Sequence, residues 1–134
     1  MIVDYLQEIK KGKYTLIVRK DNRTIFKSND SGIKGLVLAF KKGFLKDAVV
    51  YDKTVGLAAA KIAVFSKVKE LHSLLASRLA VVFCRKQEVP LKALKIVGKI
   101  YDSQNKKECY LEKMAQKTGD ISGLIKHFEN IYET

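Results

Sequence analysis

The stretch DAVVYDKTVGLAAAKIAVF, residues 47–65, decides the fold. Its first part, residues 47–52, contains the apolar run AVVY without alternation, which is typical of a strand covered on both faces. A polar turn is predicted at Asp52, Lys53 and Thr54, and a helix from about Thr54 onward. The first turns of this helix carry mostly alanines, which allow close approach to a sheet and to a neighbouring helix. A strand, turn and helix in this order indicate an α/β protein.

Upstream of this stretch the sequence predicts a helix and a hairpin. Residues 1–13 have apolar side chains at helical spacing, and Gly12 suits the left-handed end of a short amphipathic helix. Residues 14–28, YTLIVRKDNRTIFKS, contain two β-rich runs. The runs flank Asp21 and Asn22, which tolerate positive φ, so a β-hairpin is expected.

Further helices and strands alternate along the rest of the chain. Residues 31–43 predict a helix with Ser31 as its cap and Gly43 as its end. Residues 68–76 predict the next strand, and Ser77 is suited to cap the helix that follows it. The remaining predicted elements are a helix at 78–87, a strand at 93–101 after Pro90, a helix at 109–117 and a final amphipathic helix after Asp120.

This order of elements predicts a single domain that spans residues 1–134. The fold class is α/β, a three-layer α-β-α sandwich around a mixed five-stranded sheet. The hairpin strands pair antiparallel, and the later strands, which are joined through helices, are expected to be parallel.

Composition points to a soluble cytoplasmic protein. Apolar residues make up 47% of the chain, as expected for a packed core. No apolar run is long enough to span a bilayer, and the first residues do not match a signal peptide, so no membrane association is expected. Cys84 and Cys109 lie far apart and are expected to be thiols, with Cys84 as a small buried hydrophobe.

The net charge of +12 raises the question of a nucleic-acid partner. No basic run exceeds two residues, and the lysines fall mostly where a helix or strand faces water. A nucleic-acid surface usually shows clustered basic residues with interleaved aromatics or a known motif. A solvated basic surface is therefore favoured, with an RNA- or DNA-binding module kept as an alternative, and attraction of anionic ligands fits the charge.

Three sequence motifs are distinctive: SGI at residues 31–33, YDKTVGLAAA at 51–60 and CYLEK at 109–113. They resemble a small prokaryotic family of uncharacterised proteins with a cytidine-deaminase-like fold. The second motif is the most specific. In the third, Cys109 and Glu112 match the family pattern, whereas the two residues between them depart from it.

The resemblance implies the cytidine-deaminase-like fold without zinc chemistry. Zinc deaminases place a His or Cys and a Glu at one helix start, and a Pro-Cys-x-x-Cys motif at the next. The corresponding positions here, 55–57 and 76–80, offer no zinc ligand. No zinc, and no other cofactor, is therefore expected.

A ligand site is predicted where the strands end and the helices begin. Ligands of open α/β sheets bind outside the carboxyl ends of the strands, and helix N-termini favour phosphate or carboxylate. Lys53 supplies a full charge, Thr54 and Ser77 hydroxyl groups, Gly56 room for close approach, and Asp52 an acceptor for a sugar hydroxyl. Ser31 and Gly32 form a third such junction. The alternative is ordinary helix capping by Asp52 or Thr54, with Lys53 solvated.

Three functions are compatible with these patterns. The first is a metal-independent protein that binds a nucleotide or another phosphate-bearing small molecule. The second is a metal-free enzyme on a nucleotide-like substrate, in which Cys109 is the nucleophile and Glu112 the acid/base at a predicted helix start. The third is the RNA- or DNA-binding module. A homodimer is a further hypothesis, because a sheet of this kind leaves strand edges exposed and the predicted N-terminal helix has an apolar face.

Overall fold

The computed structural model describes residues 4–30, 33–98, 122–123 and 125–126 of the chain. None of the helices in this described part is long and apolar enough to cross a membrane. The helices and strands are, in chain order, α1 (Tyr5–Lys10), β1 (Leu16–Lys20), β2 (Arg23–Ser28), α2 (Lys34–Lys41), β3 (Val49–Val55), α3 (Leu57–Phe65), β4 (Glu70–Ser77), α4 (Arg78–Lys86) and β5 (Leu91–Val97).

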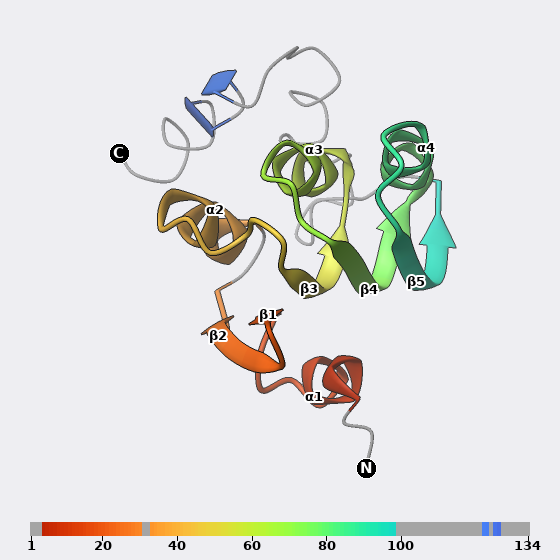
Figure 1. Cartoon of the computed structure of the whole chain (residues 1–134). Coiled ribbons are helices and arrows are strands. Elements are labelled where there is room, and N and C mark those ends of the chain that lie inside the picture. Colours follow the sequence, from red (N-terminus) through yellow and green to blue (C-terminus); the bar gives the residue numbers. More distant parts are fainter. Residues whose placement is uncertain (1–3, 31–32, 99–121, 124, 127–134) are drawn as a thin grey trace.

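The strands form one mixed sheet in the order β2-β1-β3-β4-β5. β1 pairs antiparallel with both β2 and β3, whereas β3, β4 and β5 are parallel to one another. Helices α2, α3 and α4 cover one face of the sheet, and α1 lies on the other (Figure 1). The α/β class and the mixed five-stranded sheet are thus confirmed, while the cytidine-deaminase-like assignment stays a prediction.

The predicted turns have the backbone conformations that their residue types favour. Asp21 and Asn22 connect β1 to β2 with φ of 52° and 62°, so both residues are left-handed, as a two-residue hairpin turn requires. Gly12 after α1 has φ of 88°, and Gly43 after α2 has φ of 75°. The predicted hairpin and the carboxyl ends of these two helices are therefore confirmed.

The core lies between the sheet and the helices α2 and α3. Ala58, Ala59 and Ala60 on α3 are almost completely buried, which fits a helix that approaches its neighbours closely. Gly35 on α2 shows a second close approach, since a Cβ atom there would lie 2.6 Å from the Ser28 Oγ of β2. The largest fully buried apolar side chains are Ile9, Ile17, Val18, Leu36, Leu45, Val50, Val55, Ile62 and Leu71.

The polar turn predicted at Asp52, Lys53 and Thr54 is wrong, because β3 continues through Val55. The segment pairs on both sides: the Lys53 N–H donates to the Thr15 carbonyl at 2.9 Å, and the register with β4 continues to the end of the strand. The side chains of Thr54 and Val55 are also β-branched and suit a strand. The helix consequently begins at Leu57, three residues later than predicted.

The other element boundaries differ by a few residues. β4 runs over Glu70–Ser77, one residue past its predicted end. β5 begins at Leu91, directly after Pro90, and ends at Val97. The predicted helix at 109–117 lies outside the described residues, as does most of the one after Asp120. Residues 122–123 and 125–126 are helical, and Ile125 is buried in the core.

Candidate functional site

The carboxyl ends of β3 and β4 bring two predicted strand–helix junctions together. Val55 and Ala76 are register partners on these parallel strands, so the residues that follow them, Gly56 and Ser77, are also neighbours. Gly56 precedes α3 and Ser77 precedes α4. The structure thus places both junctions side by side at one edge of the sheet, as the sequence predicts.

Asp52 is the buried acid of this edge. Asp52 is 6% exposed, and its side chain projects toward the face that carries α2, α3 and α4, because it lies two residues after the fully buried Val50 in β3 and therefore shares the face of Val50. Burial raises the pKa of the Asp52 carboxyl from 3.8 to about 7, although the nearby backbone N–H groups of Thr54 and Lys53 favour the charged form. Within the described residues no cation forms an ion pair with Asp52.

Lys53 and Thr54 point to opposite faces of the sheet, since they are consecutive strand residues. Thr54 shares the face of Asp52 and is partly buried, whereas Lys53 is exposed on the face of α1. No carboxylate in the described part of the chain pairs with Lys53. The three consecutive residues of the predicted site therefore surround the end of β3 instead of lining one pocket.

Gly56 and Ser77 differ in how much room they leave for a ligand. Gly56 is partly exposed at the start of α3, but the first helical residues, Leu57 and Ala58, are buried. Ser77 is fully buried, and its Oγ accepts a hydrogen bond of 3.1 Å from the Ala80 N–H. The capping role is therefore confirmed for Ser77, and an approaching ligand would meet Lys53, Thr54 and Gly56 first.

A third group of polar residues at the same edge was not predicted from the sequence. The Thr15 Oγ1 donates to the Asp30 carbonyl at 2.6 Å, and the Asp30 N–H donates to the Ser28 Oγ at 3.1 Å. The Thr15 carbonyl accepts the Lys53 N–H, which connects this group to the end of β3. The signal in the sequence is weak, since it consists only of polar residues at both ends of a hairpin. Ser31 and Gly32, which follow Asp30, lie outside the described residues.

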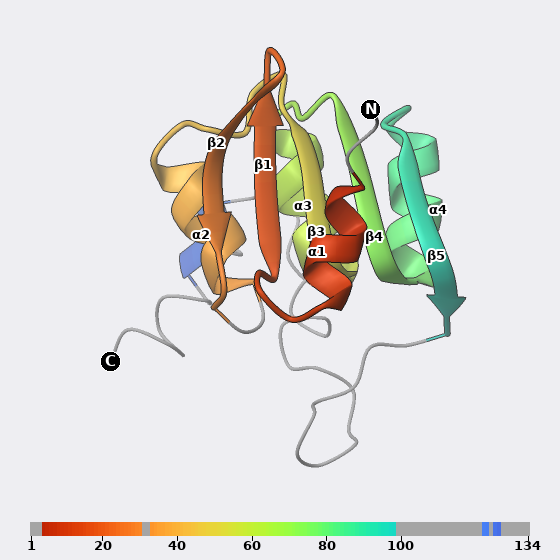
Figure 2. The same cartoon turned by 90° about the horizontal axis from the view of Figure 1, so that it is seen from below.

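A ring cluster occupies the opposite face of the sheet, beneath α1. The Tyr51 ring stacks on His72 with centroids 4.8 Å apart and contacts Tyr5 of α1 at 5.1 Å. The Arg19 guanidinium lies 4.4 Å from the centre of the Tyr5 ring, and His72 Nε2 is 3.5 Å from a Glu70 carboxylate oxygen. Burial, followed by the charge of Glu70, raises the pKa of Tyr51. These contacts give Tyr51 a packing role in holding α1 on the sheet. Figure 2 shows this helix lying against the strands.

The two cysteines are in different situations. Cys84 on α4 is 1% exposed, and burial raises the pKa of its thiol to about 11, which confirms the expectation of a small buried hydrophobe. Cys109 and Glu112 lie outside the described residues, so the catalytic pair stays a prediction. Within the described residues no three His, Cys, Asp or Glu side chains are grouped so that they could hold a metal ion.

The comparisons with known proteins agree on one family. The family described as TM1506, Domain of unknown function (DUF1893), matches residues 5–132. The crystal structure of a DUF1893 family protein (TM1506) from Thermotoga maritima is similar to this chain, with a TM-score of 0.82 and 26% sequence identity over 96% of this chain and 87% of that one. No functionally curated protein shows significant similarity. The match over nearly the whole sequence shows that this chain belongs to the DUF1893 family of unknown function.

Proposed function

We propose that this protein is a metal-independent binding domain for a nucleotide or another phosphate-bearing small molecule. The proposed site is the carboxyl edge of β3, next to the end of β4. One observation carries the proposal: a buried acid, an exposed lysine and a helix start lie within the five residues from Asp52 to Gly56. The carboxyl ends of parallel strands are the usual ligand sites of open α/β sheets.

Each group has a separate part in the proposed complex. Lys53, which has no carboxylate partner in the described residues, neutralises the phosphate. Gly56 carries no side chain, so a phosphate oxygen can approach the backbone at the start of α3. Asp52, which lies on β3 four residues before Gly56, hydrogen-bonds a sugar hydroxyl, as acceptor when ionised and as donor when protonated.

The ligand in this proposal extends over the end of β3. Because Lys53 and Asp52 point to opposite faces of the sheet, a molecule that contacts both must cross the end of the strand. A nucleotide has two polar groups far enough apart to do so. Inorganic phosphate can contact only the Lys53 and Gly56 side, so it is expected to bind more weakly than a nucleotide.

A titration with variants tests the proposed site. Ribonucleoside mono-, di- and triphosphates, their nucleosides and inorganic phosphate are titrated separately into the wild-type protein, Lys53→Ala and Lys69→Ala. Lys69 is the matched control, because it is also exposed but precedes β4 at the opposite end of the strand. A hydrogen bond to a charged group contributes about 1.5–3 kcal/mol, so Lys53→Ala is expected to raise Kd about tenfold or more.

Two results would contradict the proposal. If every nucleotide binds Lys53→Ala as tightly as the wild type, the phosphate does not lie at the end of β3. If none of the nucleotides binds the wild type, the protein is not a nucleotide-binding domain. An unchanged Kd in Lys69→Ala together with a weakened Lys53→Ala supports the site.

A further inference from the structure

The outer edge of β5 is an unpaired strand edge in the described part of the sheet. β5 pairs with β4 on one side and is the last strand in the order β2-β1-β3-β4-β5. Its exposed apolar residues, Leu94 and Ile96, are 68% and 54% exposed. They alternate with Leu91 and Ala93, which pack against the core, so they lie on the face that carries α1. Figure 2 shows that α1 lies over β3 and β4, with β5 beyond it.

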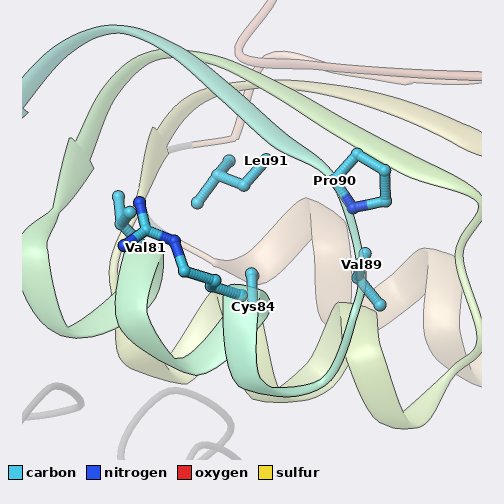
Figure 3. Close-up of a pocket in the computed structure, with 6 residues that line it drawn as sticks. Val81, Cys84, Val89, Pro90 and Leu91 are labelled. Atoms are coloured by element: carbon cyan, nitrogen blue, oxygen red, sulfur yellow. The ribbon is translucent and has the colours of Figure 1, made fainter.

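The other face of β5 borders a small hollow. This hollow lies between β5 and α4, has a volume of about 190 Å³, and is lined by Val81, Cys84, Arg85, Val89, Pro90 and Leu91 (Figure 3). For comparison, an apolar cavity of about 150 Å³ can hold a benzene molecule. The hollow therefore has room for one aliphatic side chain. The edge of β5 thus has an apolar surface on one face and, on the other, a recess that is lined by apolar side chains together with Arg85.

The charges around this edge are mainly positive. Arg85 and Lys86 at the end of α4 and Lys92 and Lys95 on β5 are all exposed. Of the acidic residues nearby, Glu70 pairs with Lys92 at 3.0 Å, and Glu88 is exposed between α4 and β5. Arg85, Lys86 and Lys95 have no carboxylate partner in the described residues. The edge is consequently complementary to an acidic partner.

We propose that the edge of β5 is a docking site for an extended acidic segment of another protein. The segment adds a strand to the sheet beside β5, and its main chain pairs with the outer edge of that strand. Alternate side chains then point to opposite faces, one into the hollow beside Cys84 and the next onto Leu94 and Ile96. This mode of recognition takes its affinity from backbone hydrogen bonds and its specificity from alternate side-chain sites.

The same charges argue against a second copy of this chain as the occupant. Two β5 strands that pair across a two-fold axis would bring the lysines of both copies together, and like charges on paired strands are destabilising. Lysines on an edge strand are a known protection against such self-pairing. An acidic segment meets no such repulsion.

A displayed peptide library tests this proposal on the full chain. The library contains octapeptides that alternate an aliphatic residue with Asp or Glu, and a second library has Lys in place of the acids. Peptides selected by the wild-type protein are labelled, and their Kd is measured by fluorescence anisotropy for wild type, Lys95→Glu and Arg23→Glu. Arg23 is the control, because it is an exposed cation on β2, the strand at the opposite end of the sheet.

We expect the wild-type protein to select peptides from the acidic library only. The Kd of these peptides should rise about fivefold in Lys95→Glu and stay within about twofold of the wild-type value in Arg23→Glu. N-methylation of alternate peptide amides removes the main-chain donors and is expected to weaken binding more than tenfold. Failure to select a peptide, equal effects of both variants, or indifference to N-methylation would overturn the proposal. Sedimentation that shows a wild-type dimer altered by Lys95→Glu would also overturn it, because the occupant would then be a second copy. The result is independent of nucleotide binding at β3.

Discussion

Asp52 makes the stability of this protein depend on pH in a direction that can be measured. Burial raises the pKa of its carboxyl from 3.8 to about 7 in the folded chain. Between these two values the folded protein holds a proton that the unfolded chain has released. The folded state therefore binds more protons than the unfolded state in this range, and the free energy of unfolding falls as pH rises.

The size of the effect follows from the same two values. Linkage gives a loss of about 1.4 kcal/mol per pH unit for one group in this range. From pH 3.8 to about 7 the total is on the order of 4 kcal/mol, a large share of the stability of a small domain. The stabilisation is complete below the unfolded pKa and is lost as pH rises through the folded one.

Asp52→Asn removes the titrating group while retaining a side-chain oxygen near the N–H groups of Lys53 and Thr54. Urea denaturation at half-unit steps from pH 4 to pH 8 gives the free energy of unfolding of the wild type and the variant. We expect Asp52→Asn to become the more stable protein toward pH 8, and the wild type to lose stability relative to it as pH rises from 4 to 7. Taking the difference between the two proteins cancels the titration of all other groups.

Asp47→Asn is the matched control, because Asp47 is exposed and its φ of 60° is tolerated by asparagine. This variant should keep the pH dependence of the wild type. If the difference between wild type and Asp52→Asn stays constant from pH 4 to pH 8, Asp52 does not change its proton occupancy on folding. Burial would then not raise the pKa of Asp52 in the folded protein.

Two further predictions concern packing. Gly35→Ala places a Cβ 2.6 Å from the Ser28 Oγ and 2.7 Å from the Ser28 Cβ. We therefore expect urea denaturation to show a free energy of unfolding that is lower by about 1–3 kcal/mol, and a second substitution, Ser28→Gly, to restore part of it. A change below about 0.5 kcal/mol would contradict this close contact. A Cys109→Ser variant leaves Cys84 as the one thiol of the chain. At pH 8 a disulfide reagent should react with the folded variant roughly a hundredfold more slowly than with the variant unfolded in urea, because the pKa of Cys84 is about 11 when folded and about 8.5 when exposed. Equal rates would show that the thiol is accessible in the folded protein.

Local sequence signals are sufficient to predict turns and helix ends where the type of one residue decides the backbone conformation. Asp21 and Asn22 form the hairpin turn, and Gly43 ends α2, because their positive φ values are costly for most other residues. Ser77 is a predictable cap, because a serine hydroxyl at this position satisfies an N–H in the first turn of the helix, as it does in α4. These features depend on neighbours a few residues away, and such neighbours are visible in the sequence.

The end of β3 could not be predicted in this way. A run of Asp, Lys and Thr has the composition of a turn, and only its pairing with two other strands makes it a strand. The Lys53 N–H donates to Thr15, which is 38 positions earlier, and Asp52 is the register partner of Leu16 and Ser73. No local pattern reports these partners. The difference between a turn and a strand changes the directions of the side chains, because consecutive side chains of a strand point to opposite faces of the sheet and those of a turn need not.

This alternation changes what the proposed site can distinguish. In a turn, Asp52, Lys53 and Thr54 could all surround one phosphate, and any small anion would satisfy them. In a strand, the cation lies on one face and the buried acid on the other, so a single phosphate cannot contact both. If the site binds nucleotides, affinity must therefore depend on both ends of the ligand. Lys53→Ala should weaken the binding of both inorganic phosphate and nucleotides, whereas Asp52→Asn should weaken only the binding of ligands that carry a sugar.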